Sequence, residues 1–149
     1  STAKGIAGGV PCGLMMAKEN VAKAFAPGDH ASTFGGNPLA TAAGNVVVDE
    51  LLGGLLDNVK EQGAYLREQL EKVAQKHKDL VKDVRGMGLM QGIELNKPAG
   101  PVVAKAIDLG LLLVGAGQFI IRFVPSLIVS KADIDTAMEI LDKALESAE

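Results

Sequence analysis

The chain is poor in aromatic residues and has a single cysteine. It contains no Trp and one Tyr, and aromatic residues make up 3% of its 149 positions. Proteins that bind single-stranded nucleic acid stack the bases on aromatic side chains, so this composition argues against that function. Cys12 is the only cysteine, and a chain without an internal disulfide fits a reducing compartment. We therefore expect a cytoplasmic protein.

The chain also lacks an excess of one charge and a long apolar run. Its formal net charge is −3, from 15 basic and 18 acidic residues, and the basic residues are scattered. This pattern predicts neither a nucleic acid nor an anionic membrane surface as a partner. We find no run near the ~20 apolar residues of a membrane span, and no signal peptide. His30 and His77 lie far apart without clustered carboxylates or thiols, so no metal site is expected.

Glycine and other small residues are concentrated in residues 1–37. This stretch is expected to form loops that bury no core of their own. Asn37 is a good N-cap, and a helix is predicted from Pro38 to near Gly53 and Gly54. Apolar residues at steps of three and four then predict a second helix through Val73. The sequence therefore changes from loops to regular structure at about residue 38.

The remaining sequence alternates predicted strands and helices. Strands are predicted at 80–85, 89–95, 111–114 and 119–124. A helix over 101–110 separates the two pairs, and Ser130 with Asp133 forms a capping-box variant that begins the final helix. Strands interleaved with helices in this way predict an α/β fold, in which helices cover one side of a small sheet.

The first two glycine-rich segments combine an amine with a phosphate cradle. Lys4 lies in TAKGIAGGVPCG, where small neighbours leave its amine open to a planar aldehyde. In PGDHASTFGGNPLATAA, Ser32 and Thr33 precede two glycines and the predicted helix that begins after Asn37. Hydroxyls, backbone N–H groups and the positive end of a helix commonly bind phosphate. An amine nucleophile together with an anion cradle suggests pyridoxal phosphate as cofactor.

These segments resemble the cofactor-lysine and phosphate-loop segments of class III, acetylornithine-type aminotransferases. The resemblance continues through VRGMGLMQGIEL and IIRFVPSLIVSKADIDTAMEIL, in the order of that family, and covers nearly the whole chain. It implies the C-terminal part of a fold-type I pyridoxal-phosphate-dependent transferase. Residues 1–52 would end the large cofactor-binding domain, and residues 53–149 would form a small C-terminal α/β domain. Because the family's earlier segments are not found, we interpret the chain as a fragment.

The resemblance also implies roles for individual residues. Lys4 would hold pyridoxal 5'-phosphate and carry a proton during the reaction, although an isolated lysine near a terminus is usually an exposed surface residue. Thr33 would bind the cofactor phosphate of the neighbouring subunit of a homodimer, and Ser32 would lie against the substrate. On spacing alone, an ordinary hydroxyl-rich turn is the alternative for both.

Arg122 in IIRFVP would bind the substrate α-carboxylate with its planar guanidinium. The alternative is a strand-edge arginine paired with an acidic neighbour. Ser126 stands nearby where the family usually has a second proline. Arg85, Gly86 and Gly88 are interpreted as structural residues that form the turn between the first two strands.

The implied activity is transfer of the terminal amino group of N-acetylornithine to 2-oxoglutarate, in arginine biosynthesis. Ornithine, succinylornithine, 4-aminobutyrate and lysine-type donors are alternatives, because similar loops serve all of them. A hypothesis of a different class is a non-catalytic α/β module formed by residues 38–149. We expect the parent protein to be an enzyme and the fragment alone to be inactive.

Overall fold

The computed structural model describes residues 1–147, and the chain divides into two compact units after Gly54. The first unit is Ser1–Gly54 and the second begins at Leu55. The sequence placed a boundary between residues 52 and 53, close to this division. The assignment of the two parts to a large and a small domain stays a prediction.

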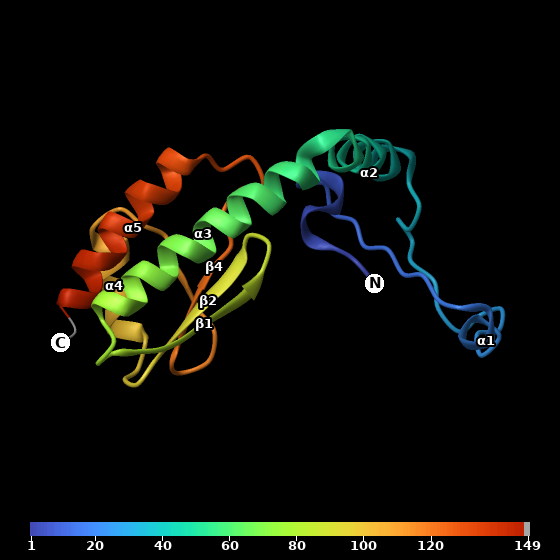
Figure 1. Ribbon diagram of the computed structural model, residues 1–149. Helices are drawn as coiled ribbons and strands as arrows, with labels where there is room; N and C mark the ends of the chain where they lie inside the picture. The colour runs from blue at the N-terminus through green and yellow to red at the C-terminus, as the bar shows by residue number, and fades with distance from the viewer. Residues whose placement is uncertain (148–149) are drawn as a thin grey trace. The chain divides into compact units, whose positions relative to one another are not determined.

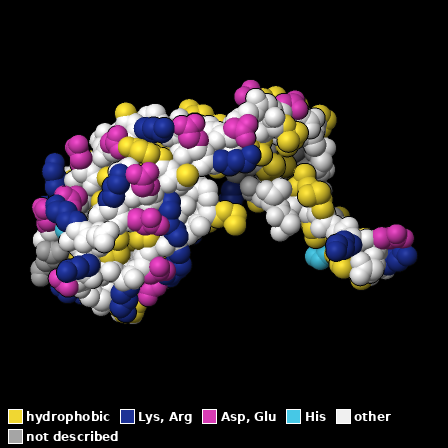
Figure 2. All heavy atoms as spheres, viewed as in Figure 1, with side chains coloured by type: hydrophobic (Ala, Val, Ile, Leu, Met, Phe, Trp, Pro, Cys, Tyr) yellow, Lys and Arg dark blue, Asp and Glu magenta, His cyan; other side chains and the backbone are white. Residues whose placement is uncertain are grey.

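The first unit contains little buried apolar surface. It has a 3-10 turn, η1 (Lys4–Ala7), and two helices, α1 (Glu19–Ala22) and α2 (Pro38–Glu50) (Figure 1). Its buried apolar residues are Ala7 and Ala40. Figure 2 shows apolar side chains on its surface. Leu39, for example, is 71% exposed. The expectation that residues 1–37 bury no core of their own is confirmed.

Helix α2 begins where the sequence predicted. The side-chain oxygen of Asn37 accepts a hydrogen bond of 2.9 Å from the N–H of Ala40, and Pro38 occupies the first turn. The expected end near Gly54 takes the form of a five-residue π-helical segment, η2 (Leu51–Leu55), in which Gly54 has φ 127°. Only glycine adopts this backbone conformation readily, which explains why the regular helix is interrupted there.

One helical stretch is long and apolar enough to cross a membrane, judged by length and composition alone. It is the run Pro38–Lys76, which combines α2, η2 and α3 (Leu56–Lys76). Only 6% of its most apolar window is buried. Asp49 and Glu50 lie within this run, so it contains no uninterrupted apolar stretch of ~20 residues, and the sequence expectation is not contradicted.

The second unit is an antiparallel sheet with helices on one face. The strands are β1 (Val81–Met87), β2 (Met90–Leu95), β3 (Val114–Gly115) and β4 (Ile120–Phe123), in the order β1-β2-β4-β3. Helices α3, α4 (Gly100–Asp108) and α5 (Lys131–Glu146) cover one face of the sheet (Figure 1). The predicted α/β arrangement is confirmed.

The third strand is much shorter than predicted. Residues 111–113 belong to no strand because the chain is still leaving helix α4 there. The N–H of Leu111 bonds to the carbonyl of Ala106 at 2.8 Å, and Gly110 has φ 94°. A left-handed glycine followed by this bond is the Schellman ending of a helix.

The core lies between the inner face of the sheet and the three helices. Ile93 and Leu95 of β2 point inward, as do Ile121 and Phe123 of β4. They pack against buried residues of the helices, namely Leu66, Leu70, Val102, Ala106, Ile134, Leu141 and Leu145. The intervening residues of both strands therefore face away from the helices, as the period of two in a strand requires. This outward face carries the charged residues discussed below.

Candidate active site

Lys4 has an unusual backbone conformation. Its φ is 61°, and among the described residues it is the only non-glycine residue with a positive φ. The left-handed region costs a residue with a Cβ about 1–2 kcal/mol. Its side chain is exposed and forms no hydrogen bond or ion pair with any residue of 1–147. Strained conformations of this kind concentrate at functional sites, so Lys4 is a candidate functional residue.

The loop before α2 offers unpaired hydroxyl groups. Ser32 and Thr33 lie in a turn in which the N–H of Gly35 bonds to the carbonyl of Ser32 at 3.1 Å. Within the described part of the chain, neither hydroxyl has a hydrogen-bond partner. The predicted cradle also includes the N-terminus of α2. There the N–H of Ala40 is already bonded to the side chain of Asn37, so the helix end offers fewer free donors than expected.

A pocket of about 490 Å³ lies between the two glycine-rich loops. Its walls are Pro11, Cys12, Gly13, Leu14, Ser32, Phe34, Gly35, Gly36, Asn37, Ala40 and Thr41. Two hydrogen bonds of 2.8 Å between the backbones of Thr2 and Leu14 tie the Lys4 segment to one wall. Ser32 therefore lines the pocket as predicted, whereas Lys4 and Thr33 lie outside its walls.

The pocket residues fit an anionic ligand. Its volume is in the range of small-molecule sites, and its walls contain hydroxyls and an amide side chain but no acidic residue. Lys4 and the unpaired hydroxyl of Thr33 are the nearby groups able to bind an aldehyde and a phosphate. This chemistry matches the cofactor suggested by the sequence.

Arg122 is an unpaired arginine on the outward face of the sheet. It lies on β4 between the buried residues Ile121 and Phe123, and β4 is an interior strand. Its guanidinium has no ion pair or hydrogen bond within residues 1–147. The alternative of a strand-edge arginine paired with an acidic neighbour is therefore wrong.

Two hollows of the second unit meet at Arg122. One, of about 210 Å³, lies beside Leu113 and Ile134. The other, of about 670 Å³, is lined by Arg85, Met87, Met90, Gly92 and Ile120 among others. An unpaired guanidinium on an apolar surface is well suited to bind a carboxylate whose remainder is aliphatic.

Arg85 also lies on the outward face of the sheet and lines the same hollow as Arg122. This position was not predicted from the sequence. Arg85 lies within β1 and not in the turn, which is formed by Gly88 and Leu89. Its guanidinium forms ion pairs of 2.7 Å with Asp83 and with Glu94. These two hydrogen-bonded carboxylates raise the pKa of Arg85 above its ordinary value. Side chains alternate in direction along β2, so Glu94 points outward. This alternation is the sequence signal that could have predicted the contact between Arg85 and Glu94.

The predicted site residues are divided between the two units. Lys4, Ser32 and Thr33 belong to the first unit and Arg122 to the second. Each group is well defined within its own unit. That all four act in one site stays a prediction.

Comparison with known proteins identifies the family. The family model described as Aminotransferase class-III matches residues 1–145. The chain belongs to the class-III aminotransferases. Members of this family depend on pyridoxal phosphate, and the predicted fold, part of the larger aminotransferase fold, is confirmed.

Relatives of this class-III chain include acetylornithine aminotransferases. It is 50% identical to that of Caldanaerobacter subterraneus subsp. tengcongensis over 96% of this chain and 36% of the relative. It is 51% identical to that of Gloeobacter violaceus over 94% of this chain and 35% of the relative. The chain thus spans little more than a third of the length of these curated relatives.

Solved structures agree with this assignment. The N-acetylornithine aminotransferase of Stenotrophomonas maltophilia has a TM-score of 0.81 at 31% identity, over 96% of this chain and 38% of that one. The ornithine aminotransferase of Plasmodium yoelii has a TM-score of 0.76 at 30% identity, over 90% of this chain and 36% of that one. The fold is thus shared by class-III aminotransferases whose names give different amino donors.

Proposed function

We propose that this chain carries the cofactor lysine of an acetylornithine aminotransferase. The intact enzyme transfers the terminal amino group of N-acetylornithine to 2-oxoglutarate, in arginine biosynthesis. The relatives near 50% identity support this substrate. The observation that carries the proposal is Lys4, an unpaired lysine in a strained backbone conformation on a segment that is bonded to the wall of a pocket, in which the hydroxyl of Ser32 is unpaired. The enzyme acts in the cytoplasm as a homodimer.

When bound, pyridoxal phosphate supplies an electron sink that stabilises negative charge on the substrate carbon bearing the amino group. Lys4 Nζ would hold the cofactor through its aldehyde group in the resting enzyme. During the reaction, the Lys4 amine would accept and return the proton of the substrate carbon that bears the amino group. The small residues around Lys4 leave room for this movement.

The other site residues bind and orient. Thr33 would donate a hydrogen bond from its hydroxyl to the cofactor phosphate of the partner subunit, and Ser32, in the wall of the pocket, would contact the substrate. Arg122 binds the substrate α-carboxylate through two parallel N–H···O hydrogen bonds, which fix both the position and the angle of the substrate.

Cofactor binding is tested by titrating the chain with pyridoxal phosphate and following visible absorbance. Borohydride reduction and peptide mapping then locate the modified lysine. We expect a single label on Lys4 that is absent from Lys4→Ala and retained in Lys18→Ala, which changes another exposed lysine of the first unit. A label spread over many lysines would contradict the assignment of Lys4.

The substrate is tested in a chimera. Residues 1–149 replace the matching segment of the Caldanaerobacter subterraneus acetylornithine aminotransferase, and the parent relative is the control. We expect the chimera to prefer N-acetylornithine over ornithine, succinylornithine and 4-aminobutyrate by kcat/KM. Faster turnover of 4-aminobutyrate or ornithine would make the substrate assignment wrong.

The second candidate function is a non-catalytic α/β module. One observation favours it for the isolated chain: nearly all buried apolar residues belong to the second unit, and only Ala7 and Ala40 to the first. Amide hydrogen exchange distinguishes the two. Protection confined to residues beyond Leu55 supports the module, whereas protection around Lys4 that rises with pyridoxal phosphate supports the enzyme.

A further inference from the structure

The outward face of the sheet places two arginines in one row across the strands. Arg85 of β1 pairs with Gly92 of β2, and Gly92 pairs with Arg122 of β4. Because Gly92 has no side chain, no side chain stands between the two arginines. Both line the same hollow of about 670 Å³.

Glu94 lies close to both arginines. It follows Gly92 by two residues on β2, so it points to the same face, and it pairs with Ile120 of β4. Glu94 is therefore the diagonal neighbour of Arg122, at a separation that long side chains bridge. Its side chain is 32% exposed. Glu94 and Arg122 project from the same face of the sheet.

The observed pairing leaves Arg122 free. Arg85 binds Glu94 through Nη2 and Asp83 through Nη1, each at 2.7 Å. Arg85 thus pairs with Asp83 and with Glu94, while Arg122 has no partner among residues 1–147. Without Arg85, the guanidinium of Arg122 is a cation that Glu94 can reach across the two paired strands.

We propose that Arg85 is a positioning residue that holds Glu94 away from Arg122 and so keeps Arg122 available for the substrate carboxylate. The proposal rests on the function proposed for Arg122. An internal carboxylate on Arg122 competes with the carboxylate of the substrate for the same guanidinium. Arg85 therefore sets the affinity for carboxylate substrates without touching them, and its loss weakens binding more than it slows the chemical step.

The internal pairing is tested on the 149-residue chain without any substrate. The side-chain Nε–Hε signal of Arg122 is followed by NMR in Arg85→Gln. We expect slower hydrogen exchange and a shifted signal, because Glu94 now binds Arg122, and we expect the double variant Arg85→Gln/Glu94→Gln to reverse both changes. Lys82→Gln, which removes a neighbouring charge on β1, is the control and leaves the signal unchanged. An Arg122 signal unaltered in Arg85→Gln would overturn the proposal.

The effect on substrate is tested in the chimera. Arg85→Gln is expected to raise KM for N-acetylornithine about threefold to fivefold, the size of an exposed ion pair, with kcat changed less than twofold. The added Glu94→Gln change restores KM, which a merely structural role of Arg85 does not predict. An active chimera whose KM is insensitive to Arg85→Gln overturns the inference. An inactive parent chimera contradicts the proposed function, while the NMR result still decides the pairing.

Discussion

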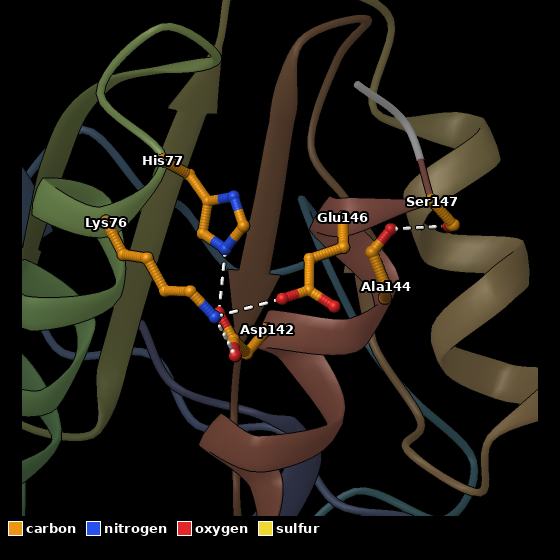
Figure 3. Close-up of polar contacts among 6 residues, drawn as sticks. All are labelled: Lys76, His77, Asp142, Ala144, Glu146 and Ser147. Carbon is orange, nitrogen blue, oxygen red and sulfur yellow. Dashed lines mark hydrogen bonds and ion pairs between the residues drawn. The ribbon is translucent and has the colours of Figure 1, made fainter.

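The ring of His77 donates a hydrogen bond from Nε2 to Oδ1 of Asp142 at 2.7 Å. His77 ends helix α3 and its side chain is 2% exposed, while Asp142 lies on α5. Lys76 binds the other oxygen of Asp142 and also Glu146 (Figure 3). These contacts join the C-terminal ends of α3 and α5 by charge as well as by packing.

Replacing Asp142 by Asn should weaken this junction. The change removes the negative charge that faces the buried ring of His77 and the ammonium of Lys76. Breaking a hydrogen bond to a buried group costs about 1–3 kcal/mol, so we expect the free energy of unfolding to fall by that amount in urea titrations. Glu146→Gln, at a site 54% exposed, is the control and should cost less than about 1 kcal/mol.

The same residue should make stability depend on acid pH. Burial raises the pKa of Asp142, but hydrogen bonds from Lys76 and His77 outweigh it and hold the pKa below its ordinary value. The stabilisation is therefore complete above the unfolded pKa of about 3.9 and is lost as the pH falls through the lower folded pKa. Unfolding curves of the native chain should lose more stability below about pH 4 than those of Asp142→Asn. If the native chain and Asp142→Asn lose stability equally as the pH falls, Asp142 is not the cause of the acid dependence.

Lys4→Gly should stabilise the first unit while it abolishes cofactor capture. Glycine adopts φ 61° without the cost that lysine incurs, so we expect a gain of about 1 kcal/mol. Hydrogen exchange at Thr2 and Leu14, which are bonded to each other, reports this gain. Lys4→Ala removes the amine but keeps the Cβ, so it should not stabilise. Equal protection in both variants would mean that the backbone of Lys4 is not strained.

Gly63→Ala should destabilise the second unit. A Cβ at Gly63 would lie 2.6 Å from the carbonyl carbon of Gly88, and backbone moves only at a cost. Overpacking of this kind costs about 1–3 kcal/mol, measurable as a lower midpoint in urea. Gly100→Ala is the control, because nothing lies within 4 Å of its added Cβ. A Gly63→Ala variant as stable as Gly100→Ala would contradict the close packing of α3 on the hairpin.

Local patterns accounted for most of the regular structure. The Asn37 cap, the capping box of Ser130 and Asp133, and the apolar spacing of α3 and α5 were read from neighbouring residues, and the structure confirms them. The predicted length of β3 was wrong. The Schellman ending of α4 holds Leu111 by a hydrogen bond from its N–H to the carbonyl of Ala106. Apolar residues at 111–113 fit a strand equally well, and only the geometry of the preceding helix decides.

The candidate site was predicted unevenly. Motifs identified Lys4, Ser32 and Thr33, and the structure brings Ser32 into a pocket wall but leaves Lys4 and Thr33 outside it. Arg122 was expected on a strand, where the structure places it, whereas Arg85 was interpreted as a residue of the turn but lies within β1. A glycine-rich hairpin gives no local sign of which residue ends the strand, so the register of β1 on β2 could not be read from it.

The sequence by itself determined where helices begin, which strands exist and which family the chain belongs to, because caps, periodicity and motifs depend on residues a few positions apart. Tertiary structure alone decided the strained φ of Lys4, the pairing of Arg85 with Glu94, and the bond from His77 to Asp142, 65 residues away. The register of the sheet and the packing of α5 on α3 bring these groups together, and neither is encoded in a short stretch of sequence.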